Sequence, residues 1–222
     1  MKFLDKYKSF NESNETTNNN PVRSERLLTQ AQREWKDDSE IESTERLPSM
    51  LFTDVEGSSE KWSTDPVTMM QQLKGHHELV DMISKKWNGW IVKTIGDAFM
   101  VYFEPSEDSL ENALNCAKEI IQSEKNYNLR CGICEGPLQE DTFTLQKVQL
   151  RDFFGNSVNV ASRMESKVAE QSGVIAFSSL EPISKNKLYQ FSNNIGEVQE
   201  VNLKKYELKG AKTDAAYKIK VK

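Results

Sequence analysis

Three short stretches of the sequence carry residues that could act on phosphate groups. In the first, LFTDVEGSS, an apolar run ends at Asp54 and is followed at once by the small residues 57–59. A carboxylate at the end of a buried strand offers a hard oxygen ligand for Mg²⁺, and free backbone amides in such a loop can bind phosphate oxygens. An aspartate here could instead only cap the next helix.

The second stretch, VKTIGDAFM, places Asp97 directly after Gly96 at a predicted hairpin turn. The glycine permits close approach of a ligand to the backbone. Asx-Gly turns of this kind are also common structural features. A pair of carboxylates on neighbouring strand ends is nevertheless what a two-metal phosphoryl-transfer site requires.

The third stretch, DFFGNSVNVASRME, contains Asn159 and Arg163 four residues apart, which places them on one face of a predicted helix. An amide and a guanidinium that project together suit the orientation of a ribose and the neutralisation of a transferring phosphoryl group. A solvated polar face is the alternative.

An alternation of strands and helices positions these residues. The patterns predict strands at 49–54, 90–94, 98–103, 129–133, 142–150 and 174–178, and a closing hairpin of 201–208 with 216–221. They predict helices over 66–87, 106–123 and 155–166. The order β-α-β-β-α-β fits an α/β fold, a ferredoxin-like α+β sandwich with extra C-terminal strands.

The helix that follows the Asp65-Pro66 capping pair carries an apolar stripe. Its members are Met70, Leu73, Val80, Ile83 and Trp87. The adjacent His76 and His77 are expected at the edge of this stripe, on the surface.

Composition divides the chain into a polar N-terminal arm, 1–46, which we expect to be flexible, and a catalytic domain, 47–222. The net charge of -5 argues against nucleic acid as a partner, and no apolar run is long enough to span a membrane. Three cysteines and no secretory signal favour a soluble, cytoplasmic protein. The arm is a candidate contact for an unidentified regulator.

In their order and spacing these stretches resemble the catalytic domain of the class III nucleotidyl cyclases, the adenylyl and guanylyl cyclases. The blocks that carry the resemblance are LFTDVEGSSEKW, VKTIGDAFMVYF, RDFFGNSVNVASRMES and LKGAKTDAAYKI, within residues 47–221. The resemblance implies a phosphorus–oxygen lyase that converts a nucleoside triphosphate to the 3′,5′-cyclic nucleotide and pyrophosphate.

The resemblance also implies how the metal ions and the triphosphate are held. Asp54, Asp97 and the Val55 carbonyl would bind two Mg²⁺ or Mn²⁺ ions per active site. Backbone amides of the loop would bind the β- and γ-phosphates, and this loop comprises Glu56, Gly57, Ser58 and Ser59. A lysine late in the chain, Lys209 or Lys212, would bind the triphosphate as well.

Residues of the other two blocks would contact the rest of the nucleotide. By the resemblance, Lys93 and Asp152 would read the base, Asn159 would position the ribose and Arg163 would stabilise the transition state. In this family each site lies at a dimer interface and draws the two sets of residues from different subunits. Because one chain here carries both sets, a symmetric homodimer with two sites is expected. Residues 141–151 resemble the projecting hairpin that helps to hold that dimer.

The Lys93 and Asp152 pair narrows the choice of base without fixing it. Lysine can donate to adenine N1 while aspartate accepts from the N6 amine, which favours ATP. Cytosine presents the same edge, whereas guanine and uracil present the opposite order. A pyrimidine cyclase of an antiviral system, then a guanylyl cyclase, and finally a catalytically silent nucleotide-binding dimer are therefore the alternatives to an adenylyl cyclase.

Overall fold

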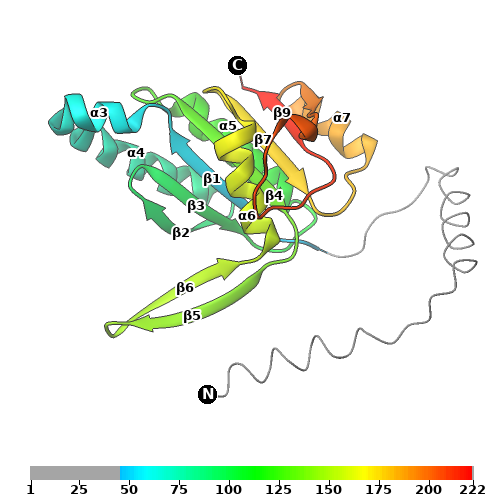
Figure 1. Ribbon diagram of the computed structural model, residues 1–222, viewed down its shortest axis with the longest axis horizontal. Helices are drawn as coiled ribbons and strands as arrows, with labels where there is room; N and C mark the ends of the chain where they lie inside the picture. Colours follow the sequence, from blue (N-terminus) through cyan, green and yellow to red (C-terminus); the bar gives the residue numbers. More distant parts are fainter. Residues whose placement is uncertain (1–45, 222) are drawn as a thin grey trace, which may run out of the picture. The chain divides into compact units, whose positions relative to one another are not determined.

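The computed structural model describes residues 46–221, so the arm predicted for 1–46 lies outside the described residues except for Arg46. Within this part, seven strands form one sheet in the order β2-β3-β1-β4-β7-β9-β8 (Figure 1). Their bounds are β1 Ser49–Val55, β2 Gly89–Ile95, β3 Ala98–Phe103, β4 Leu129–Glu135, β7 Val174–Ser179, β8 Val198–Glu200 and β9 Tyr217–Lys220. The first four strands lie in the predicted ferredoxin-like arrangement, and the last three add to the sheet beyond β4.

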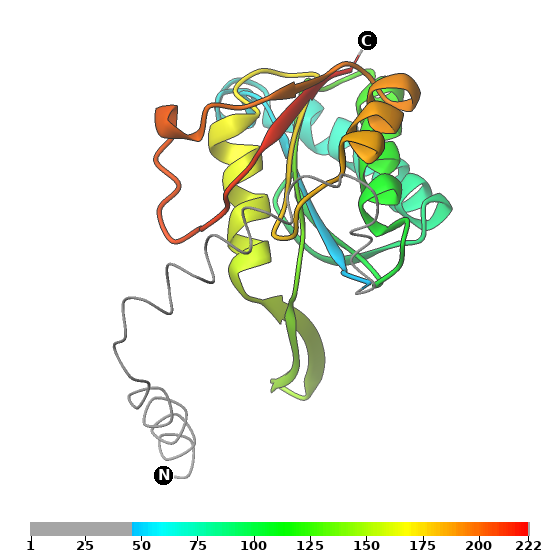
Figure 2. The same cartoon turned by 90° about the vertical axis from the view of Figure 1, so that its right-hand side faces the viewer.

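The helices alternate with these strands along the chain. They are α3 Ser58–Thr64, α4 Pro66–Lys86, α5 Ser109–Ser123, α6 Asn156–Arg163 and α7 Lys185–Asn194. A π-helical turn, Met164–Val168, continues α6, and a short 3₁₀ turn spans Leu203–Lys205. A separate hairpin of β5 Gln139–Leu145 and β6 Val148–Phe154 extends away from the sheet (Figure 2).

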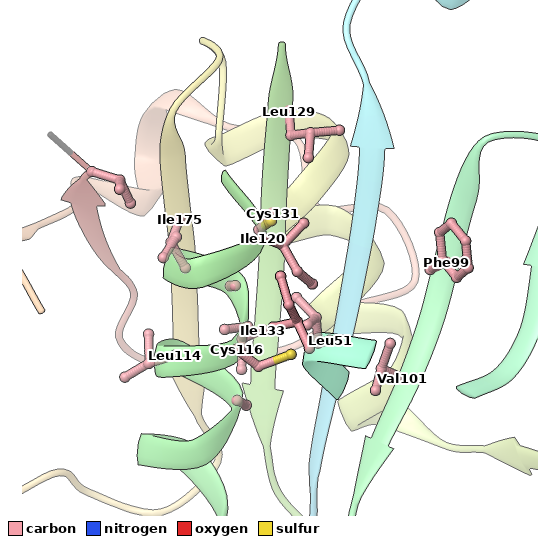
Figure 3. Close-up of a cluster of buried hydrophobic side chains, with 14 of the residues drawn as sticks. Leu51, Phe99, Val101, Leu114, Cys116, Ile120, Leu129, Cys131, Ile133 and Ile175 are labelled. Atoms are coloured by element: carbon pink, nitrogen blue, oxygen red, sulfur yellow. The ribbon is translucent and has the colours of Figure 1, made fainter. Parts of the chain in front are cut away.

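Both faces of the sheet are covered. Because successive side chains of a strand point to opposite faces, Leu51 packs into one cluster while its neighbour Met50 packs into the other. The first cluster lies under α4 and α5, and Figure 3 shows Leu114 and Ile120 of α5 against the strands. The second cluster lies under α6. The sheet is therefore a rigid support for the loops and helix ends that carry the candidate site.

The α4 helix begins where the sequence predicts, but its buried stripe differs in part. Asp65 caps it by accepting a hydrogen bond from the Thr68 amide at 3.1 Å. Met70 is 49% exposed, whereas Met69 is buried, which makes the assignment of Met70 to the stripe wrong. The helix rotates by about 100° per residue, so an error of one position moves a side chain out of the core.

The expectation of a surface position is also wrong for His76, which is only 1% exposed. Its Nδ1 lies 2.7 Å from Glu124 Oε2, and the ring contacts Phe99 and Tyr127 edge-on. Burial lowers the pKa of His76 from its ordinary value of 6.5, with the Glu124 carboxylate acting in the opposite direction. Sequence pattern alone gave no sign of a buried acid 48 residues away to partner this histidine.

This burial predicts a pH-dependent loss of stability. Folded protein with a lowered His76 pKa binds fewer protons than the unfolded chain, so its free energy of unfolding should fall as the pH drops below about 6.5. The free energy of unfolding is measured in urea at several pH values between about 5 and 8, the range in which histidine titrates. His76→Gln should remove the contribution of this histidine to the change of that free energy with pH. His77→Gln, which leaves the Glu124 contact in place, should retain it; equal slopes in wild type and His76→Gln would contradict the prediction.

Two predicted segments of the C-terminal half are corrected. The strand predicted over 142–150 contains the hairpin turn, because Gln146 and Lys147 adopt positive φ angles of 50° and 71° between β5 and β6. The strand predicted over 201–208 is replaced by a 3₁₀ turn and irregular chain, and β8 pairs with β9 instead. The sequence pattern also missed α7, which buries only Phe191 in its interior.

Candidate active site

Asp54 and Asp97 lie at the same end of neighbouring strands. β1 pairs with β3 as far as Thr53 opposite Phe99, so Asp54 comes just after this last pair on β1 and Asp97 comes just before it on the chain that leads into β3. Gly96, at φ 65°, gives the β2–β3 turn the left-handed backbone that places Asp97 there. Asp97 is 7% exposed, and its Oδ2 atom has no hydrogen-bond partner among the described residues. An unpartnered buried carboxylate oxygen costs stability and is suited to a cation.

Asp54 is held by an arginine that the sequence analysis did not single out. β1 and β4 pair with Asp54 opposite Arg130, whose Nη2 donates to Asp54 Oδ2 at 2.8 Å. Arg130 Nε also lies 2.6 Å from Oε1 of Glu165 in the π-helical turn. Burial raises the pKa of Glu165 to about 7, while the nearby guanidinium opposes that rise. A charged residue inside the apolar run of β4 was the available sequence signal, because such residues are seldom buried without a partner.

The small-residue loop after β1 turns directly into α3. Gly57 has φ 71°, a conformation that favours glycine, and Ser58 and Ser59 form the first turn of the helix. The Glu56 amide already donates to the Asn128 carbonyl at 2.9 Å. The Glu56 amide therefore already donates its hydrogen bond within the chain. The backbone amides that follow it are better candidates to donate hydrogen bonds to a phosphate.

Lys93 and Asp152, 59 residues apart in sequence, meet in the structure. Lys93 Nζ lies 2.5 Å from Asp152 Oδ2, and both side chains are partly exposed. The neighbouring Arg151 fixes the base of the hairpin, because its guanidinium lies 4.5 Å from the Trp90 ring centroid and pairs with Glu140. The hairpin thus brings a carboxylate from β6 to a lysine on β2.

Asn159 and Arg163 share α6, as their spacing predicts. The predicted helix 155–166 is an α-helix only as far as Arg163, after which it widens into the π-helical turn. Arg163 Nε donates to the Lys209 carbonyl at 3.1 Å, so the late loop lies against this helix. The Lys209 ammonium is exposed and lies 3.3 Å from Glu207.

The structure therefore assembles the predicted residues into separate groups. Asp54 and Asp97 lie together, Lys93 meets Asp152, and Arg163 meets the backbone at Lys209. Within the part of the chain that the structure describes, no hydrogen bond or ion pair joins either of the first two aspartates to Asn159 or Arg163. The connection that does exist runs from Asp54 through Arg130 to Glu165.

Comparison with known proteins places this geometry in a family. The model of the adenylate and guanylate cyclase catalytic domain matches residues 41–220. The chain belongs to this family and is a class III nucleotidyl cyclase catalytic domain. An adenylate cyclase of Podospora anserina is 30% identical over 166 residues, which cover 64% of this chain and 8% of that relative. The chain thus spans less than a tenth of the curated relative's length.

Solved cyclase domains share the fold. The guanylate cyclase domain of RhGC from Catenaria anguillulae, in complex with GTP, has a TM-score of 0.64 and 25% identity, covering 80% of this chain and 97% of that chain. The catalytic core of a rhodopsin-guanylyl cyclase with converted specificity, in complex with ATPαS, has a TM-score of 0.63 and 26% identity, covering 82% and 100%. Both confirm the mixed α/β architecture.

A further property concerns the helices. Between residues 46 and 221, none combines the length and the apolar character needed to cross a bilayer.

Proposed function

We propose that this chain is an adenylyl cyclase, which converts ATP to 3′,5′-cyclic AMP and pyrophosphate. The observation that carries the choice of base is the contact between Lys93 Nζ and Asp152 Oδ2 at 2.5 Å. A cationic donor and an anionic acceptor held side by side complement the N1 acceptor and N6 amine of adenine. Guanylyl cyclase activity is the second candidate, because solved guanylyl cyclase domains share this fold.

The residues at the end of β1 and just before the start of β3 suit divalent cations. Asp97 offers a buried oxygen without a hydrogen-bond partner in the described chain, and Asp54 and the Val55 carbonyl add further hard oxygen donors. No group of three or more histidine, cysteine or acidic side chains suited to a metal occurs among residues 46–221. Mg²⁺ is commonly bound by one or two carboxylates together with substrate phosphates, so this small donor set fits it. When bound, the ions supply Lewis-acid activation of the 3′-hydroxyl and neutralise triphosphate charge.

The remaining residues bind and orient the nucleotide. Amides at Gly57, Ser58 and Ser59 bind phosphate oxygens, and the exposed Lys209 ammonium adds positive charge. Asn159 positions the ribose. The 3′-oxygen forms a bond to the α-phosphorus, the bond from that phosphorus to the pyrophosphate oxygen breaks, and the proton of the 3′-hydroxyl passes to solvent water. Arg163 stabilises the negative charge of that transition state.

The proposed active unit is a homodimer. Asp54 and Asp97 of one protomer would complete a site with Lys93, Asp152, Asn159 and Arg163 of its partner. Apolar side chains on the projecting hairpin favour such an interface, because they are exposed in the single chain. They are Phe143, Leu145, Val148, Leu150 and Phe154.

A competition assay tests the choice of base. Purified protein receives equal ATP, GTP, CTP and UTP with Mn²⁺, and the cyclic products are resolved by mass spectrometry. Cyclic AMP as the main product is the expected result. Cyclic GMP would favour the second candidate, cyclic CMP or UMP would indicate a pyrimidine cyclase, and no product from a dimeric sample would support a silent nucleotide-binding module.

A substitution tests the same contact. Lys93→Met should lower kcat/KM for ATP by about 10- to 100-fold, because it removes a charged donor and leaves Asp152 without its partner. Lys85→Met removes an exposed lysine that pairs with Asp81 on α4 and should leave kcat/KM unchanged. Equal kcat/KM in both variants would remove Lys93 from base recognition.

A further inference from the structure

Asp54, Arg130 and Glu165 form a network of three charged side chains. Arg130 contacts both carboxylates, at 2.8 Å through Nη2 and at 2.6 Å through Nε. One cation is thus shared by two anions, and the network carries a net negative charge when both carboxylates are ionised. The arginine side chain is 28% exposed and that of Glu165 is 11% exposed, so water screens these charges only in part.

We propose that Glu165 is a positioning residue for the metal site: its carboxylate keeps the Arg130 side chain in place when a divalent cation binds to Asp54. This inference rests on the proposed metal-binding role of Asp54. A cation at Asp54 competes with the Arg130 guanidinium for the same carboxylate. Because Glu165 contacts the guanidinium through a different nitrogen, Nε rather than Nη2, Arg130 keeps an ion pair after Asp54 has bound the metal.

Backbone packing fixes Glu165 in this position. Gly132 lies two residues after Arg130 on β4, so both residues face the same side of the sheet. A Cβ atom at Gly132 would lie 2.0 Å from the Glu165 amide nitrogen and 2.3 Å from the Ala161 carbonyl oxygen. The absence of a side chain at this glycine therefore allows the end of α6 and the π-helical turn to approach the strand closely. That approach brings Glu165 beside Arg130.

The π-helical turn supplies the second geometric element. It begins one residue after Arg163 and includes Glu165, so the chain widens between the two residues. Such turns interrupt α-helices at a cost and occur often at functional sites. Here the turn allows Arg163 to contact the late loop at Lys209 while Glu165 contacts the strand.

Removal of the Glu165 charge should weaken metal binding for two reasons that act in the same direction. Arg130 would then have Asp54 as its only carboxylate partner in the network, which strengthens the pair that the metal must displace. Metal binding would also leave a partly buried guanidinium without an ion pair. We expect Glu165→Gln to lower the affinity for Mn²⁺ by about tenfold, the effect of losing one charge-assisted contact.

The test measures Mn²⁺ binding to the nucleotide-free full chain by water-proton relaxation enhancement. Glu165→Gln is compared with wild type, with Glu165→Asp and with the matched control Glu170→Gln. Glu170 carries the same charge nearby but pairs with Lys218 at 3.3 Å, away from the network. Thermal unfolding without metal verifies that each variant is folded.

The expected order of affinity is wild type and Glu170→Gln first, Glu165→Asp next and Glu165→Gln last. In assays with ATP, Glu165→Gln should need more Mn²⁺ for half-maximal rate while retaining most of its kcat at saturating metal. Unchanged Mn²⁺ affinity in Glu165→Gln, an equal loss in Glu170→Gln, or no gain in Glu165→Asp over Glu165→Gln would overturn the inference.

A different result would indicate failure of the proposed function itself. If wild type binds Mn²⁺ no more tightly than Asp97→Asn does, Asp54 and Asp97 do not form a metal site. That outcome overturns both proposals, and it is distinguishable because the failure appears in the wild-type chain. If Glu165→Gln fails to fold, the comparison of Glu165→Asp with Glu170→Gln decides: an affinity of Glu165→Asp equal to the control overturns the inference.

Discussion

Asp97→Asn should reduce cyclic nucleotide formation by more than about 100-fold without lowering the stability of the metal-free protein. Loss of the carboxylate charge weakens a metal ligand, which accounts for the expected fall in rate. Stability should hold or rise, because the variant removes a buried anionic oxygen that has no hydrogen-bond partner among residues 46–221. A loss of activity without a loss of stability is what distinguishes a functional carboxylate from a structural one.

The measurement is the initial rate of cyclic AMP formation with Mn²⁺, together with thermal unfolding of the metal-free variant. Asp81→Asn is the matched control, since Asp81 is an aspartate on α4 that pairs with Lys85. The control should retain wild-type activity. A metal-binding role for Asp97 would be contradicted by either of two results. In the first, Asp97→Asn remains active; in the second, it is inactive but its unfolding temperature is also clearly lowered.

Much of the fold could be predicted because its signals are local. The Asp65-Pro66 cap starts α4, and the predicted Gly96-Asp97 turn joins two strands that the structure confirms. Local spacing also places Asn159 and Arg163 on one helix. Each of these features depends on residues within a few positions of one another, where backbone preference and side-chain periodicity act directly.

The features that could not be predicted depend on contacts between distant residues. Arg130 meets Asp54 across 76 residues, and His76 meets Glu124 across 48. Neither pairing leaves a periodic trace in the sequence, because only the register of the sheet and the packing of helices bring the partners together. The prediction of a strand over 201–208 is wrong for the same reason: the strand that pairs with β9 is β8, which is three residues long and is defined more by that pairing than by its composition.

The network of Asp54, Arg130 and Glu165 also shows that sequence motifs can indicate the individual residues of a site and still leave out a residue that contacts them. The sequence blocks identify the groups that would touch the nucleotide. They do not identify the cation that neutralises Asp54 before a metal binds, since that role follows from the pairing of β1 with β4. The proposed metal affinity would therefore depend partly on Arg130, which lies outside the recognised blocks.

Mixing two inactive variants should restore activity if the proposed dimer shares its sites between chains. Asp97→Asn removes a proposed metal ligand. Arg163→Ala removes the side chain proposed to stabilise the transition state and should itself lower kcat by about 100- to 1,000-fold. In a heterodimer of the two, one site receives Asp97 from one chain and Arg163 from the other, so that site is intact. The second site of the same heterodimer carries both substitutions.

The expected recovery follows from the symmetry of the assembly. Equal mixing gives half heterodimers, and each has one intact site of two, so the sample should reach roughly a quarter of the wild-type rate. Native mass spectrometry verifies that heterodimers have formed, and each variant mixed with wild type serves as the control for exchange. Verified heterodimers without recovered activity would mean that each chain builds its site alone, and the shared-site dimer would have to be abandoned.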